Sequence, residues 1–176
     1  MAGQLGDLLR RERSPGAAFE RALAIRSIGR LLGSDAGPVS LEAARVALDR
    51  ILDARQAPIE RIQLMDWLAI SHHELLLYTA STVLDFETDP KIVANAVHDL
   101  GCVREADRAG AAGVLVRRFD PNAPEVVRSA IATSLGKVGD PSIVGFLVDV
   151  ARTDASPSTR LSAQHAVANV LNRSKE

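Results

Sequence analysis

The chain has 176 residues, of which 47% are hydrophobic and 24% charged, and its formal net charge is −1. This length suits one domain, and this balance is typical of a globular protein and excludes disorder along most of the chain. No apolar run approaches the roughly 18 residues of a membrane span, and residues 1–13 contain no apolar stretch typical of a secretory signal. Because Cys102 is the single cysteine, we expect no internal disulfide and a reducing, cytoplasmic compartment.

Only 3% of the residues are aromatic, so the core must consist of Leu, Val, Ile and Ala. Alanine and leucine are strong helix formers, whereas β-branched and aromatic runs, which favour strands, are scarce. The composition therefore predicts an all-α protein. Its richness in alanine, and in arginine over lysine, is typical of a GC-rich genome, so we expect a bacterial origin.

The chain contains an internal repeat. The segment from Arg128 to Pro141 reads RSAIATSLGKVGDP, and similar units begin at Arg21, Arg61, Val93 and Arg160. These starting points are 40, 32, 35 and 32 residues apart. Apolar residues recur three, seven and ten positions after most of them, with Ser71 an exception, which places them on one stripe of a helix.

The repeat predicts the order of elements along the chain. Residues 1–14 are expected to form an amphipathic or frayed segment, and residues 15–176 a single repeat domain. Its units are 15–57, 58–87, 88–121, 122–155 and a half repeat at 156–172. The first helix of each unit is expected at 17–32, 58–70, 90–102, 124–138 and 157–172. The second helices are expected at 40–55, 72–86, 104–118 and 141–153.

Cap residues support these helix starts. Asp89-Pro90 and Ser156-Pro157 each place a side-chain acceptor directly before a proline, the pair that commonly opens a helix. In Gly139-Asp140-Pro141 a glycine suited to the end of one helix precedes the same kind of start. Ser71 and Glu74 have the spacing of a capping box, which predicts that a second helix begins at about residue 72.

The fourth repeat resembles a known family. The run from Leu135 to Leu147, following Arg128-Ser-Ala, is similar to a HEAT repeat of the bacterial, phycobilin-lyase-like subgroup. The resemblance extends over about residues 15–172 and is weakest in the second repeat. It implies a right-handed α-solenoid of about 4.5 HEAT-like helix pairs, with the second helices lining a concave groove. Each pair would bury its apolar face against its neighbours.

Two clusters suggest chemistry, but simpler explanations suit both better. His72, His73 and Glu74 include metal-ligand types, and a HEAT-repeat iron enzyme uses His-Glu pairs, but such a centre needs several pairs and this chain has one. Cys102 lies four residues after His98, yet no third partner or oxyanion device accompanies it. We therefore predict no catalytic residues, no metal and no cofactor.

The second helices carry the candidate partner-binding residues. Two of these helices are apolar over more than one stripe, so either neighbouring repeats bury them on two sides or they leave an exposed strip for a partner. A third carries arginines suited to carboxylates at the edge of the groove. The predicted partner-binding residues are Leu77, Tyr78, Arg104, Arg108, Phe146 and Val150.

The sequence thus predicts a non-catalytic protein-interaction scaffold that binds another protein or peptide along a concave face. One alternative is a chromophore-lyase-like enzyme subunit. Another is a nucleic-acid-binding HEAT-like protein, against which the net charge of −1 and the scarcity of aromatic residues argue. No membrane partner is expected, and the open ends of a solenoid would allow homodimers.

Overall fold

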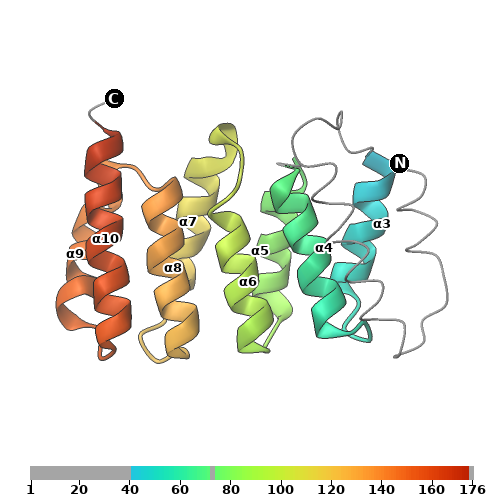
Figure 1. Ribbon diagram of the computed structural model, residues 1–176, viewed down its shortest axis with the longest axis horizontal. Helices are drawn as coiled ribbons and strands as arrows, with labels where there is room; N and C mark the ends of the chain where they lie inside the picture. Colours follow the sequence, from blue (N-terminus) through green and yellow to red (C-terminus); the bar gives the residue numbers. More distant parts are fainter. Residues whose placement is uncertain (1–40, 72–73, 175–176) are drawn as a thin grey trace.

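A computed structural model describes residues 41–71 and 74–174. Within these ranges the chain forms eight α-helices and no strand (Figure 1). They are α3 (Leu41–Leu52), α4 (Pro58–Ile70), α5 (Leu76–Phe86), α6 (Pro90–Leu100), α7 (Arg108–Arg118), α8 (Glu125–Val138), α9 (Val144–Thr153) and α10 (Pro157–Arg173). The predicted N-terminal segment 1–14 and the helix 17–32 lie outside the described residues.

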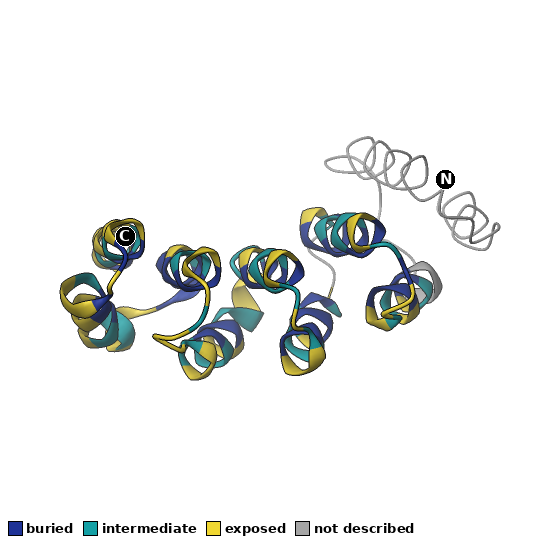
Figure 2. Cartoon of the chain, turned by 90° about the horizontal axis from the view of Figure 1, so that it is seen from below, coloured by how far each residue is buried: buried dark blue, intermediate teal, exposed yellow. Residues whose placement is uncertain are grey.

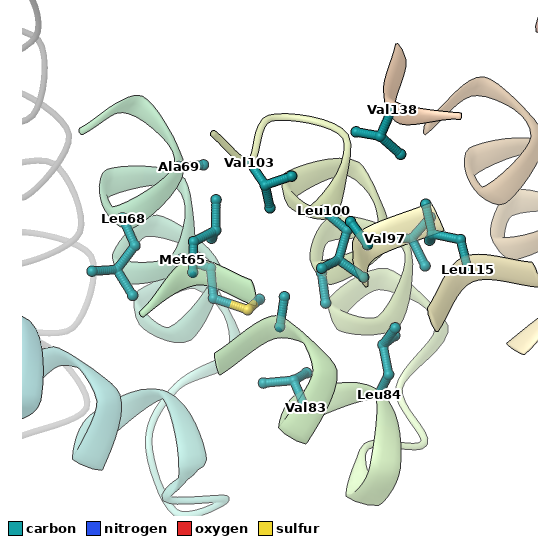
Figure 3. Close-up of a cluster of buried hydrophobic side chains, with 14 of the residues drawn as sticks. Met65, Leu68, Ala69, Val83, Leu84, Val97, Leu100, Val103, Leu115 and Val138 are labelled. Carbon is teal, nitrogen blue, oxygen red and sulfur yellow. The ribbon is translucent and has the colours of Figure 1, made fainter. Parts of the chain in front are cut away.

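The helices lie in two layers (Figure 2). Helices α4, α6, α8 and α10 pack side by side in one layer, and α3, α5, α7 and α9 form the other. A nearly continuous core runs between the layers, made mainly of Leu, Val, Ile and Ala. Figure 3 shows part of it, where Met65, Val83, Leu100 and Leu115 come from four different helices. The aliphatic core expected from the composition is therefore present.

Helix boundaries follow the repeat closely in the first-helix layer. Helix α4 spans the predicted range, and α6, α8 and α10 differ from theirs by one or two residues. Helices α5, α7 and α9 begin three or four residues later than predicted, and α3 ends three residues before the predicted 55. Short 3-10 turns at Glu105–Asp107 and Pro141–Ile143 come before α7 and α9, because the chain must turn sharply before each helix. None of the described helices is long and apolar enough to cross a membrane.

The predicted caps hold at three turns and fail at one. Asp89, Asp140 and Ser156 each accept a backbone N–H at the start of the next element, and each is followed by proline. Ser71 instead ends α4, where its hydroxyl donates to the carbonyl oxygen of Leu68 at 3.0 Å. The predicted capping box is therefore wrong: α5 begins at Leu76, and its N-cap Leu75 offers no side-chain acceptor.

Glycines allow two close approaches in the last repeats. Gly139 ends α8 with φ of −71°, so it is not there for a left-handed conformation. A Cβ at Gly139 would collide with the side chain of Ile143, which explains why glycine suits this turn. A Cβ at Gly136 would lie 2.8 Å from the Cα of Ala166, so α8 and α10 touch there through small residues.

Buried arginines join consecutive loops at equivalent places in two repeats. Arg61, near the start of α4, places Nη1 2.6 Å from Oε2 of Glu87, in the loop before α6. Arg128, near the start of α8, binds both carboxylate oxygens of Asp154, in the loop before α10, at 2.8 and 2.9 Å. In both pairs the arginine precedes its carboxylate by 26 residues.

These arginines also bind backbone carbonyls, so each one links two neighbouring segments of the chain. Arg61 donates from Nε to the carbonyl oxygen of Ile51 at 2.7 Å, and Arg128 donates from Nη1 to that of Ala123. The third repeat lacks the arginine, because Val93 occupies the aligned position. The arginine that recurs in the sequence thus acts as a brace between repeats.

We expect Arg128→Ala to lower the free energy of unfolding by about 2–4 kcal/mol, because it leaves the Asp154 carboxylate buried without its cation. Chemical denaturation followed by circular dichroism at 222 nm would measure this change. Arg117→Ala removes an exposed arginine of α7 and serves as the matched control, with a change within about 0.5 kcal/mol. Equal unfolding midpoints for the two variants would contradict the bracing role.

Candidate interaction surface

Two aromatic side chains lie exposed on α5. The sequence contains six aromatic residues, and the structure describes five of them. Trp67 is 2% exposed, whereas Tyr78 is 59% and Phe86 83% exposed. In a chain so poor in aromatic residues, leaving two of them in water on one helix is unusual, because each would gain free energy by burial.

The apolar pattern of α5 explains why Tyr78 faces outward. Leu76, Thr79, Ala80, Val83 and Leu84 are buried and lie at helical spacing on one face. Tyr78 falls on the opposite side of the helix, where the half-buried Thr82 and exposed Asp85 also lie. Phe86, seven residues after the buried Thr79, lies beside the buried face and is exposed because it is the last residue of the helix.

A pocket of about 580 Å³ lies beside Phe86. It forms where the ends of α3 and α5 meet the starts of α4 and α6. Its apolar lining residues are Leu52, Ala54, Pro58, Val83, Phe86 and Ile92. Leu52 is 38% exposed at its edge. The pocket is large enough to hold an apolar side chain of a partner.

Carboxylates surround this pocket. Glu87 and Asp89 line it, and Asp85 lies one residue before Phe86, where it forms an ion pair with Arg118 of α7. Although burial would raise the pKa of Glu87, hydrogen bonds from the backbone N–H groups of Asp89 and Thr88 and the nearby Arg61 hold it below its ordinary value. Glu87 therefore stays ionised at neutral pH.

The predicted partner-binding residues do not form one surface. Tyr78 is exposed as expected, but Leu77 is half-buried, and one of its methyl groups would lie 3.0 Å from a Cβ at Gly110 of α7. Phe146 packs edge-to-face against Phe119 with ring centroids 5.3 Å apart. Val150 is only 5% exposed, and its place in the expected strip is wrong.

The position of α9 explains the burial of Val150. This valine packs between the two helices of the other layer, against Ala132 of α8 and Ala163 of α10. The second apolar stripe of α9 is therefore used within the fold, and its exposed apolar residue is Val148, which is 37% exposed.

Arg104 and Arg108 lie away from the α5 pocket. They follow the C-terminal end of α6, whereas Asp89 and Ile92, at the other end of that helix, line the pocket. An 11-residue helix is about 16 Å long, so the two places are well separated. Arg104 pairs with Asp107 at 2.9 Å, and Arg108 lies 3.8 Å from Glu105.

The structure describes the two clusters of catalytic residue types in part. His72 and His73 lie outside the described residues, and among the described residues no group of three or more His, Cys, Asp or Glu side chains could hold a metal ion. Burial raises the pKa of the Cys102 thiol, which lowers the share of the reactive thiolate. The ring of His98 lies near Asp99 and Lys137, whereas the Cys102 sulfur approaches the backbone carbonyl oxygen of His98 at 3.7 Å.

A polar chain runs inward from Lys137. Its ammonium lies 3.5 Å from Nε2 of His98, and Nδ1 of the same ring lies 3.5 Å from Asp99 Oδ1. Asn95 donates to the second Asp99 oxygen at 2.9 Å and to Asp66 at 3.2 Å. Asp99 is 1% exposed, and burial raises its pKa to about 6.

We expect Asp99→Asn to stabilise the protein at pH 7.5 by up to about 3 kcal/mol, given about 1.4 kcal/mol per pKa unit. A carboxyl whose pKa is raised on folding contributes stability below its unfolded pKa, near 3.9, and loses it as the pH rises through 6. The difference between variant and wild type should therefore shrink between pH 7.5 and 5. Denaturation midpoints at several pH values would show it, and a pH-independent difference would contradict it.

Sequence reasoning missed the exposure of Phe86, because its spacing predicts burial. Phe86 ends the predicted helix 72–86 and lies between Asp85 and Glu87. It follows the buried Val83 by three residues and the buried Thr79 by seven, so the apolar pattern contains no signal for its exposure. The loops that build the pocket around it come from separate repeats.

No protein-family model matches the sequence, and no curated protein matches it significantly. The resemblance to HEAT repeats thus rests on the residues of this chain alone.

Proposed function

We propose that this chain is a non-catalytic interaction module that binds a partner protein or peptide over the exposed surface of α5 around Tyr78 and Phe86. The exposure of Tyr78 and Phe86 on one helix, with a pocket beside Phe86, is the observation that carries this proposal. Aromatic residues supply large contact areas and are enriched among the residues that dominate binding energy at interfaces.

The fold part of the proposal is a HEAT-like, right-handed solenoid. Two features support it: the helix pairs alternate between two layers, and the arginine braces recur with the same separation in different repeats. Such a stack is ordered before a partner arrives, so little binding energy is lost to folding. The single cysteine supports a cytoplasmic location.

The pocket beside Phe86 has no excess of positive charge, which favours a protein over a nucleic acid. Glu87 and Asp89 line it together with Arg61, which pairs with Glu87, and Asp85 pairs with Arg118 of α7. This balance offers no attraction for a phosphate backbone, whereas a segment with a large apolar side chain would fit the pocket.

We expect the double variant Tyr78→Ser, Phe86→Ser to lose its partner while keeping its fold. Tagged wild type and variant would capture proteins from lysate of the source cell, with quantitative mass spectrometry as the readout. Removal of two central aromatic residues should lower capture of the partner more than about tenfold. Because both side chains are exposed, the unfolding midpoint should change little.

The matched control is Val126→Ser, Leu161→Ser. Both residues are 51% exposed and lie on α8 and α10, in the other layer. A protein retained by the control and lost by the aromatic variant, and bound directly when purified, would support the proposal. The same proteins captured by all three forms would contradict it.

A further inference from the structure

A second depression lies at the opposite end of the helices from the α5 pocket. It has a volume of about 520 Å³ and forms where the C-terminal ends of α6, α8 and α10 meet the start of α7. Its lining residues are Gly101, Cys102, Val103, Arg108, Gly136, Lys137, Asn169, Asn172 and Arg173. The depression is shallow and open to solvent.

Its polar lining consists of cations and amides. Arg108, Lys137 and Arg173 contribute positive charge, and Asn169 and Asn172 contribute side-chain amides from the last turns of α10. None of the described residues that line the depression is an aspartate or a glutamate. The site is therefore locally positive on a chain whose net charge is −1.

These cations differ in how many hydrogen bonds and ion pairs they form with other groups of the protein. Arg173 donates to the carbonyl oxygens of Gly136, Lys137 and Gly139 at 2.6 to 3.1 Å, so it caps the end of α8 and keeps its charge at the depression. Arg108 lies 3.8 Å from Glu105, beyond hydrogen-bond distance, and the Glu105 side chain is 89% exposed.

The Lys137 ammonium has three N–H donors, and the described residues engage at most one of them. Among the described residues its ammonium lies 3.5 Å from Nε2 of His98 and forms no ion pair with a carboxylate. Its stem lies close to Gly101, where a Cβ would be 3.1 Å from Lys137 Cδ. The amide nitrogen of Asn169 lies near Gly136, 3.6 Å from where a Cβ would be. The two glycines allow these side chains to approach the backbone closely.

We propose that this depression binds a small organic anion through a phosphate or carboxylate group. Lys137 would supply the principal charge, and Asn169 and Asn172 would donate hydrogen bonds. Arg108 and Arg173 would add to the positive potential. This site is separate from the proposed partner surface, and the two proposals can fail independently.

Titration of the full chain with sodium phosphate, and separately with sodium malonate, tests the proposal. The readout is the backbone amide shifts in ¹⁵N-correlated NMR spectra, at ionic strength held constant with sodium chloride. We expect one of the two anions to produce saturable shifts centred on Gly136, Asn169 and Asn172. The anion that binds more tightly identifies which group the site prefers.

The decisive variant is Lys137→Gln, with Lys91→Gln as the matched control. Lys91 is an exposed lysine at the start of α6, at the other end of the helix, so both variants remove the same charge. Lys137→Gln should weaken binding at least fivefold, and Lys91→Gln should leave it unchanged. Asn172→Ala, on an exposed side chain, should weaken it by a smaller factor.

Two results would overturn the proposal. One is linear, unsaturable shifts spread over all exposed cations with both anions. The other is equal weakening by Lys137→Gln and Lys91→Gln, which would mean that only net charge matters. Unchanged unfolding midpoints for both variants would show that the loss of binding does not come from loss of fold.

Discussion

Two buried arginine–carboxylate pairs connect loops that belong to consecutive helix pairs. A helix pair of this kind can bury only part of its apolar surface by itself, so the relative position of neighbouring pairs must be held. Arg61 with Glu87 and Arg128 with Asp154 provide this at equivalent places, and each arginine also binds a backbone carbonyl. Because these charges are shielded from water, each partner is costly to leave alone.

A fold braced in this way leaves its outer faces available. The core lies between the two layers and consists of aliphatic side chains, so aromatic residues are not needed to fill it. Phe119 and Phe146 pack against each other near the last repeats, but Tyr78 and Phe86 remain in water on α5. These two rings make no contribution to the buried core, and the proposed partner surface is built on them.

The two ends of the helices have different chemistry. At one end, loops with Glu87 and Asp89 surround an apolar pocket, and at the other, Lys137, Arg108 and Arg173 surround a depression with two asparagine amides. Part of the positive charge offsets the carbonyl groups at the C-terminal ends of α6, α8 and α10. Arg173 shows this directly, since its guanidinium binds three such carbonyls. Lys137 contacts a histidine ring instead and keeps donors for a ligand.

The sequence by itself determined the helical class, the repeat spacing and most helix boundaries. Those features depend on local propensity, on caps such as Asp89 and Ser156 and on the period of apolar residues. Each of these signals lies within one short stretch of the sequence. Only the tertiary structure decided that Val150 is buried, that Ser71 closes a helix and that Phe86 borders a pocket. Each of these depends on which neighbouring helix or loop covers a given face, and residues from separate repeats set that contact.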